Sequence, residues 1–250
     1  MGASSDNLDT IAALHAKRLL PSRGAIADLG CTQLRGATGE DVLRFLRHFG
    51  PIEAAEAERL ARHNTFLGEH LTAAGFRYQS FDIIEAPMCE HFDLNGDSVP
   101  ERHRNAFDLV LNFGTTEHVL NQLNAMKAMH DMAKPGGLFY SLFVRGGHMD
   151  HGLLHYSDRF VDLLCAANRY DTVWRDDQNK SGGECTWIVL RKVVAAPFAA
   201  PLDVEEESDG AAAAAHGPFR EAARHGPFGA LRRRLRPRTR LKALWEALRP

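Results

Sequence analysis

The chain has 250 residues, 44% of them hydrophobic and 25% charged, which is the composition of a globular protein and not of a disordered or fibrous one. No apolar run approaches the ~20 residues of a membrane-spanning helix, and the polar start MGASSDNLDT predicts no secretory signal. Four scattered cysteines without a C-x-x-C pair argue against a disulfide framework or zinc motif and predict a cytoplasmic location.

The net charge of −2 conceals an uneven distribution of charge. Ten basic and two acidic residues lie at 216–250, whereas the other 215 residues carry 20 basic and 30 acidic ones. We therefore expect a body at 1–195, a linker rich in Ala, Pro and acidic residues at 196–215, and a basic, partly amphipathic tail at 216–250.

Short apolar runs and segments of helical periodicity alternate along the body. Strands are expected at 24–30, 76–83, 90–95, 107–113, 138–144, about 170–175 and 184–192. Helices are expected between them at 37–50, 52–74, 119–133 and 157–168. This alternation with short connections predicts an α/β fold with a doubly wound, mostly parallel sheet.

Two of the helices carry more specific predictions. Thr38 and Asp41 have the spacing of an N-terminal capping pair at the start of the helix at 37–50. In the helix at 119–133, the apolar spacing predicts an inner face formed by Leu120, Leu123, Met126 or Lys127, and Met129.

The segment FDLVLNFGTTEHVLNQLNAMKAMHDMAKPGGLFYSLF at 107–143 is the most informative in the chain. It holds a strand that begins Phe-Asp, the pair Glu117-His118, a helix and Lys-Pro-Gly-Gly, in that order. With DLGC at 28–31 upstream, residues 24–192 resemble the class I S-adenosylmethionine-dependent methyltransferases of the small-molecule branch. The resemblance implies a seven-stranded Rossmann-like sheet with its last strand antiparallel, helices on both faces, and S-adenosyl-L-methionine bound across the carboxyl ends of the first four strands.

The resemblance also implies which residues bind the cofactor. An acid and a glycine after the first strand would lie against the methionyl part, an acid at the end of the second would accept hydrogen bonds from the ribose, and a third acid would lie beside the adenine. The positions that correspond are Asp28, Gly30, Cys31, Asp82, Ile83, Asp93, Leu94, Asn112, Phe113 and Gly114. We expect Phe81 and Ile83 to flank Asp82 as buried neighbours, and Glu85 is the alternative acid if the strand ends later.

The chain departs from the family pattern in two ways. The 52 residues from Gly30 to Asp82 exceed the usual spacing and predict a helical insert at about 36–75, as a lid or part of the acceptor pocket. Thr32 and Leu34 stand where the family has glycines that allow close backbone approach. Because S-adenosylmethionine carries no phosphate, we expect the altered loop to remain competent.

Histidines near the expected methyl position are candidates for contact with the acceptor. His118 is a candidate general base, with a packing or substrate-positioning role as the alternative. The loop GGHMDHGLLHY at 146–156 offers the acceptor His148, His151, His155 and Tyr156. Its His and Asp spacing matches no closed zinc pattern, so no metal is predicted.

The sequence therefore predicts a methyltransferase that acts on a small or medium-sized acceptor, such as a sugar, a lipid-linked compound or a metabolite. The acidic body would repel nucleic acid, although the run RRRLR at 232–236 attracts phosphates and predicts contact of the tail with an anionic membrane surface or an acidic protein. The main alternative is a catalytically silent, methyltransferase-like scaffold with a degenerate glycine loop. A nicotinamide-dependent oxidoreductase is disfavoured, because a full G-x-G-x-x-G is missing.

Overall fold

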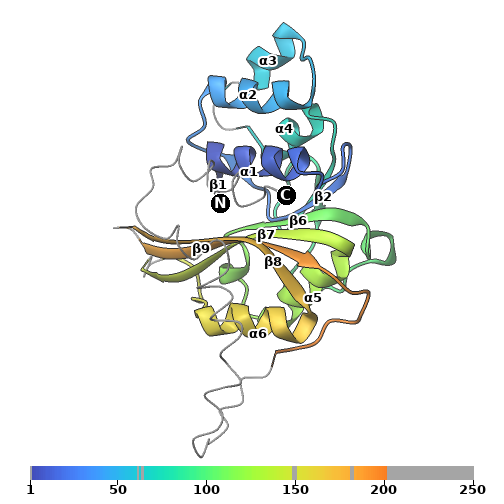
Figure 1. Ribbon diagram of the computed structural model, residues 1–250, viewed down its shortest axis with the longest axis vertical. Helices are drawn as coiled ribbons and strands as arrows, with labels where there is room; N and C mark the ends of the chain where they lie inside the picture. The colour runs from blue at the N-terminus through green and yellow to red at the C-terminus, as the bar shows by residue number, and fades with distance from the viewer. Residues whose placement is uncertain (1, 61, 63–64, 148–150, 181–182, 202–250) are drawn as a thin grey trace, which may run out of the picture.

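The computed structural model describes residues 2–60, 62, 65–147, 151–180 and 183–201. A seven-stranded sheet runs through the molecule, with helices α1 to α4 on one face and α5 and α6 on the other (Figure 1). The strand order is β5-β4-β2-β6-β7-β9-β8, and β9, the last strand in the chain, is antiparallel to both of its neighbours. The other neighbouring strands pair in parallel. This is the predicted doubly wound, Rossmann-like sheet.

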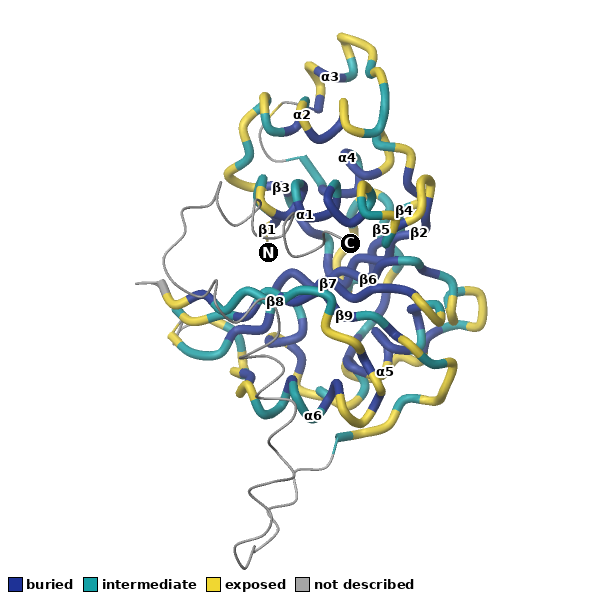
Figure 2. The backbone as a smooth tube through the Cα atoms, viewed as in Figure 1, coloured by how far each residue is buried: buried dark blue, intermediate teal, exposed yellow. Residues whose placement is uncertain are grey.

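The strands of the sheet follow the apolar runs of the sequence. They are β2 (Ala25–Leu29), β4 (Arg77–Asp82), β5 (Cys89–His91), β6 (Phe107–Phe113), β7 (Ala133–Gly147), β8 (Tyr170–Lys180) and β9 (Gly183–Lys192). The central strands β2 and β6 are buried almost throughout, because helices cover both of their faces (Figure 2). The Lys-Pro-Gly-Gly break lies inside β7, where the pairing with β6 shifts register.

The helices are α1 (Ser5–Ala16), α2 (Gly39–Phe49), α3 (Ala54–Leu60), α4 (Leu67–Ala73), α5 (Gln122–Met132) and α6 (Asp158–Asn168). Short 3-10 turns lie at Glu101–His103 and Thr116–His118. The predicted capping pair of α2 is confirmed: the Asp41 amide donates to Thr38 Oγ1 over 3.2 Å, and the Thr38 amide donates to the Asp41 carboxylate over 2.9 Å.

The prediction of a single helix at 52–74 is wrong. Immediately before α4, Phe66 pairs with Gln33 in an isolated β-bridge, and the Leu34 amide donates to the Thr65 carbonyl oxygen over 2.9 Å. The segment ahead of α4 is therefore recruited to the loop that follows β2. Helix α4 is the last element of the connection from β2 to β4 and packs on β4.

The predicted burial of three apolar side chains is also wrong. Leu120 and Leu123 are 74% and 57% exposed, because α5 begins only at Gln122 and turns a different face inward. That inner face consists of Ala125, Met126, Ala128, Met129 and Met132. Phe81 is buried as expected, but Ile83 is 63% exposed, since the strand ends at Asp82 and the chain turns into solvent.

Residues at the start of the expected linker contact the body. The Ala196 carbonyl oxygen lies 2.7 Å from His130 Nε2, the Ala199 amide donates to Asn168 Oδ1 over 2.9 Å, and Phe198 packs against the core beneath α5 and α6. The remainder of the linker and the tail lie outside the described residues. Within the described part of the chain, no helix combines the length and apolar character needed to cross a membrane.

Candidate active site at the carboxyl edge of the sheet

The carboxyl ends of three neighbouring parallel strands meet at one edge of the sheet. The Gly30 amide, just after β2, donates to the Phe81 carbonyl oxygen in β4 over 2.8 Å, and the Cys31 amide donates to Asp82 Oδ2 over 2.9 Å. Thr115, after β6, donates its hydroxyl to the Leu29 carbonyl oxygen. The fold thus brings together Gly30, Cys31 and Asp82, three of the predicted cofactor residues, at the edge where open α/β sheets bind ligands.

The loop that lacks the family glycines forms a small sheet of its own. After Gly30, whose φ of +98° needs a glycine, the strand β3 (Gln33–Leu34) pairs in parallel with β1 (Gly2–Ala3). Thr32 is fully buried and donates its hydroxyl to Asp28 Oδ1 over 3.0 Å, and Leu34 is buried in the core beside α1. Both side chains therefore point into the protein and not out from the loop surface.

Asp28 lies beneath this loop and is fully buried. Its two carboxylate oxygens accept hydrogen bonds from Thr32 and from the Tyr78 hydroxyl, the latter over 2.7 Å. Burial raises the pKa of Asp28 to about 7, against the lowering effect of these hydrogen bonds. Asp28 thus stabilises the loop through its hydrogen bond with Thr32, and its contact with the cofactor stays a prediction.

Asp82 ends β4 as predicted and is half-buried. Its Oδ1 accepts a hydrogen bond from the Ile83 amide over 2.7 Å, and its Oδ2 accepts one from Cys31. Each carboxylate oxygen can accept a further bond, so both remain able to bind a pair of hydroxyls. Ile83 and Ile84 follow as exposed apolar side chains at the same edge, and Glu85 is exposed beyond them.

The remaining predicted cofactor residues serve the turns around this edge. Asp93 Oδ1 accepts a hydrogen bond from the Asn95 amide over 2.8 Å, and Leu94 is buried in the core. Asn112 is fully buried and holds the turn after β6, because its side chain bonds Thr116 Oγ1 and the amides of Thr115 and Thr116. Direct contacts of these residues with the cofactor stay predictions.

Phe113 and Gly114 complete the end of β6. The Phe113 ring is buried with its centroid 4.9 Å from that of Tyr140 and 5.6 Å from that of Trp187. Gly114 has a φ of +87°, and a Cβ there would lie 2.8 Å from Glu117 Oε1. The absence of a side chain at Gly114 thus leaves room for the Glu117 carboxylate.

Glu117 and His118 meet the loop after β7 beside this turn. The Glu117 carbonyl oxygen accepts hydrogen bonds from the amides of Leu153 and Leu154, over 2.7 and 3.1 Å. The Glu117 side chain is buried, and this burial raises its pKa to about 7. His118 and His151 are exposed, with ring centroids 4.7 Å apart. Burial, and then His151, lower the pKa of His118, whose role as a base stays a prediction.

The expected acceptor loop is described only in part. His148 and Asp150 lie outside the described residues, and His155 is exposed. Tyr156 is buried in the core, and its hydroxyl donates a hydrogen bond to Gln122 Oε1 over 2.7 Å. We therefore do not include Tyr156 in the proposed acceptor site. Sequence reasoning gave Glu117 no chemical role, although its position beside His118 and after a buried strand was a usable signal.

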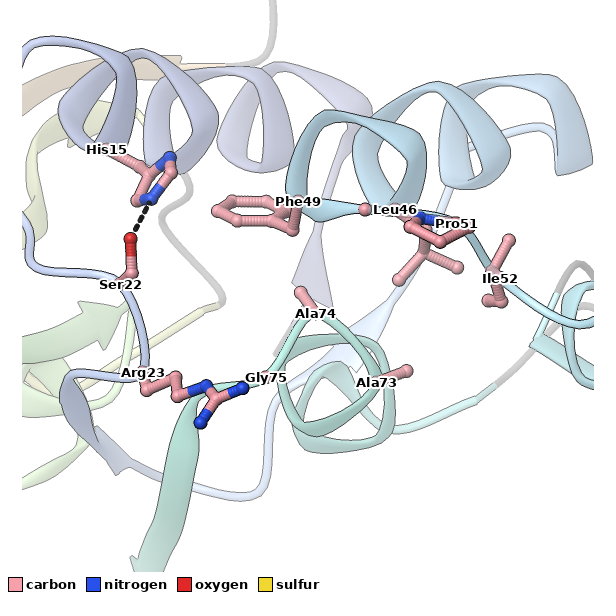
Figure 3. Close-up of a pocket in the computed structure, with 11 residues that line it drawn as sticks. His15, Ser22, Arg23, Leu46, Phe49, Pro51, Ile52, Ala73, Ala74 and Gly75 are labelled. Atoms are coloured by element: carbon pink, nitrogen blue, oxygen red, sulfur yellow. Dashed lines mark hydrogen bonds between the residues drawn. The ribbon is translucent and has the colours of Figure 1, made fainter.

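A cavity of about 290 Å³ lies at the opposite edge of the sheet (Figure 3). It is lined by the ends of α1, α2 and α4, including His15 and Phe49, and by residues just ahead of β2, including Arg23. His15 Nε2 lies 2.8 Å from the Ser22 hydroxyl. Because this is the amino edge of the parallel strands, we do not place the cofactor there.

The sequence profile of a methyltransferase domain family matches residues 36–174, more than half of the chain. The chain therefore belongs to this family, and the predicted S-adenosylmethionine-dependent methyltransferase domain is confirmed, with S-adenosyl-L-methionine as methyl donor. A ubiquinone biosynthesis O-methyltransferase from Ruegeria pomeroyi is 33% identical over 84 residues, or 29% of this chain and 34% of that protein. The match thus spans about a third of that relative.

Solved methyltransferase structures are similar to this chain at low sequence identity. One is a 1,6-didemethyltoxoflavin-N1-methyltransferase from Burkholderia thailandensis, solved with bound 1,6-didemethyltoxoflavin and S-adenosylhomocysteine. It is 15% identical to this chain, with a TM-score of 0.46 over 76% of this chain and 80% of that chain. The N-methyltransferase NodS from Bradyrhizobium japonicum is 16% identical, with a TM-score of 0.41 over 74% of this chain and 97% of that chain.

Proposed function

We propose that the protein transfers the methyl group of S-adenosylmethionine to a nucleophile on a small or medium-sized acceptor that has an apolar portion. The observation that carries this proposal is the distribution of exposed large apolar side chains. Of six such side chains in the described part of the chain, five follow the carboxyl ends of β4, β6 and β7, at Ile83, Ile84, Leu120, Leu123 and Leu153. Exposed apolar surface gathered beside a polar site is typical of ligand binding.

Each part of the carboxyl edge has a role in this proposal. Gly30 lets the backbone approach the cofactor, the Asp82 carboxylate accepts hydrogen bonds from the ribose hydroxyls, and Ile83 covers the adenine. Thr32 and Leu34 leave the site open, since their side chains lie inside the protein. Methyl transfer from a sulfonium depends chiefly on the alignment of nucleophile, carbon and sulfur, which fixed loops at a strand edge provide.

An acceptor with an apolar portion, such as a lipid-linked compound or a metabolite, fits this edge better than a nucleic acid. Outside 216–250 the chain carries 30 acidic and 20 basic residues. The resulting net negative charge repels a polyanion. Assays of S-adenosylhomocysteine release should therefore respond to hydroxylated compounds with alkyl or prenyl chains and not to DNA or RNA. Release with oligonucleotides alone would contradict the proposed acceptor class.

The cofactor part of the proposal is tested by calorimetric titration of the full chain with S-adenosylhomocysteine. Wild type is expected to bind at micromolar concentration, and Asp82→Ala to weaken binding at least about tenfold through lost charge-assisted hydrogen bonds. Glu85→Ala, an exposed acid in the same loop, serves as the matched control and should bind like wild type. A folded wild type that binds nothing would instead support a catalytically silent scaffold.

The tail's contact with an anionic membrane surface or an acidic protein stays a separate prediction. The full chain and a chain lacking 216–250 should differ in sedimentation with vesicles of anionic phospholipid, at low but not high salt, because nine arginines and one lysine lie in this segment. Equal sedimentation of the two proteins would contradict binding of the tail to an anionic membrane surface.

A further inference from the structure

Glu117, His118 and His151 place one carboxylate and two imidazoles around a common point. Each offers one possible ligand atom, and these atoms all lie within 4.8 Å of one another. Glu117 and His118 come from the turn after β6, whereas His151 comes from the loop after β7. The two amide hydrogen bonds to the Glu117 carbonyl oxygen tie these loops together, so the backbone fixes the distance between the two halves of the cluster.

One oxygen of the Glu117 carboxylate has no hydrogen-bond partner among the described residues. This oxygen is Oε2, and the residue is only 2% exposed. Gly114 and Gly152 enclose it: a Cβ at Gly114 would lie 2.8 Å from Glu117 Oε1, and one at Gly152 would lie 3.1 Å from Glu117 Cγ. A buried carboxylate oxygen without a donor is costly, and a cation beside it would remove that cost.

We infer that Glu117, His118 and His151 form a binding site for a divalent transition-metal ion, of which zinc is the representative. Two imidazoles and one carboxylate are a donor set that such ions accept readily. Ligand atoms at about 2.0–2.2 Å from an ion lie roughly 3–4 Å from one another, so small rotations of the two exposed imidazoles close the site.

This inference departs from the sequence prediction of no metal. That prediction rested on the spacing of His148, Asp150, His151 and His155 within one loop. The cluster takes its carboxylate and one imidazole from a different loop, more than thirty residues earlier in the chain, and spacing along one loop does not reveal it.

Three protein ligands would leave at least one coordination position of a bound metal free, and the cluster lies at the edge assigned to the acceptor. If the proposed function holds, on which this one step rests, the ion would lower the pKa of an acceptor hydroxyl coordinated there, which loses its proton to solvent; its oxygen then takes the methyl group as the carbon–sulfur bond breaks and S-adenosylhomocysteine leaves. The metal site itself stands on the geometry of the three side chains and is independent of methyl transfer.

The test uses the full chain without an affinity tag, stripped of metal and titrated with Zn²⁺ by calorimetry and with Co²⁺ by visible absorption. We expect one equivalent of Zn²⁺ to bind, and the Co²⁺ spectrum to show coordination by imidazole. Glu117→Gln, His118→Ala and His151→Ala should each weaken Zn²⁺ binding at least about tenfold. Glu117→Gln keeps the shape of the buried side chain, and His118 and His151 are exposed, so circular dichroism should report folded proteins.

The chain offers a matched control in its other pair of facing histidines. His15 Nδ1 lies 3.1 Å from His48 Nε2, at the opposite edge of the sheet. The double variant His15→Ala/His48→Ala should bind Zn²⁺ like wild type. The inference is overturned if wild type binds no metal, if the three cluster variants bind like wild type, or if only the control loses binding. Failure of both metal-free and zinc-loaded wild type to bind S-adenosylhomocysteine would count against the proposed function and not against the metal site.

Discussion

Asp28 and Glu117 are two buried carboxylates at the same edge of one sheet, and they differ in what surrounds them. Burial raises the pKa of each to about 7. Both oxygens of Asp28 accept hydrogen bonds, from Thr32 and Tyr78, whereas Glu117 Oε2 has no partner among the described residues. Burial alone therefore does not distinguish a framework residue from a candidate ligand, but the hydrogen bonds of each oxygen do.

The turns next to these two carboxylates differ in the same way. The turn after β2 is closed, because Thr32 and Leu34 are buried and β3 pairs with β1. The turn after β6 is open, because His118 is exposed and one oxygen of the Glu117 carboxylate beside it has no partner among the described residues. We conclude that the first turn supports the site from beneath, while the second supplies groups for chemistry.

The largest effect is expected from truncating the closed turn. Leu34→Ala should lower the free energy of unfolding by about 2–4 kcal/mol, because it opens a cavity in the core beside α1. Urea denaturation measures this. Replacement by the family's glycine should cost more still, since it also loosens β3. A loss under about 0.5 kcal/mol, the range of surface changes, would show that the turn is not a structural support.

A smaller effect is expected from the charge of Asp28. The pKa of this acid rises from 3.8 to about 7 on folding, so its contribution to stability is complete below pH 3.8 and is lost as the pH rises to about 7. Asp28→Asn does not ionise. Its free energy of unfolding relative to wild type should rise by about 2 kcal/mol between about pH 5 and about pH 8.

Asp41→Asn provides the control for that measurement. Burial alone would raise the pKa of Asp41, but the hydrogen bonds that its carboxylate accepts from Thr38 and Arg44 outweigh this effect and lower the pKa, so Asp41 stays ionised across the same range. Its stability difference from wild type should therefore stay constant between the two pH values. A constant difference for Asp28→Asn as well would mean that this carboxylate does not carry the cost of a buried charge.

The smallest effect on stability is expected at the open edge. Leu120→Ala repeats the substitution made at Leu34, but its side chain is 74% exposed, so the free energy of unfolding should change by less than about 0.5 kcal/mol. The KM for an apolar acceptor should nevertheless rise, because Leu120 stands at the proposed site. Unchanged kinetics would remove Leu120 from the acceptor surface.

Local sequence patterns predicted most of the main elements, and some of those not predicted depend on partners distant in the chain. The runs at β2 and β6 and the Thr38–Asp41 cap are visible in the sequence because each depends on neighbouring residues. Helix α1 was missed although Leu8, Ile11 and Leu14 have helical spacing. Strand β3 has only two residues, and its pairing partners in β1 lie 31 residues earlier in the chain, so no local pattern marks it. The exposure of Leu120 and Leu123 follows from where α5 begins, which apolar spacing left undetermined.

The candidate site, too, has features that the sequence predicts and features that only the structure reveals. Asp82 was recognisable as the acid that ends a strand, and its approach to Cys31 follows from the parallel pairing of β2 with β4. The grouping of Glu117 with His151 needed the structure, because it depends on how two loops dock.

The most direct test of the account asks which edge of the sheet binds the cofactor. S-adenosylhomocysteine is titrated into Ile83→Ser, at the carboxyl edge, and into Ile52→Ser, which lines the amino-edge cavity. We expect Ile83→Ser to weaken binding about tenfold, as loss of a covered isoleucine does, and Ile52→Ser to bind like wild type. Weaker binding in Ile52→Ser with no change in Ile83→Ser would place the cofactor at the opposite edge and contradict the account.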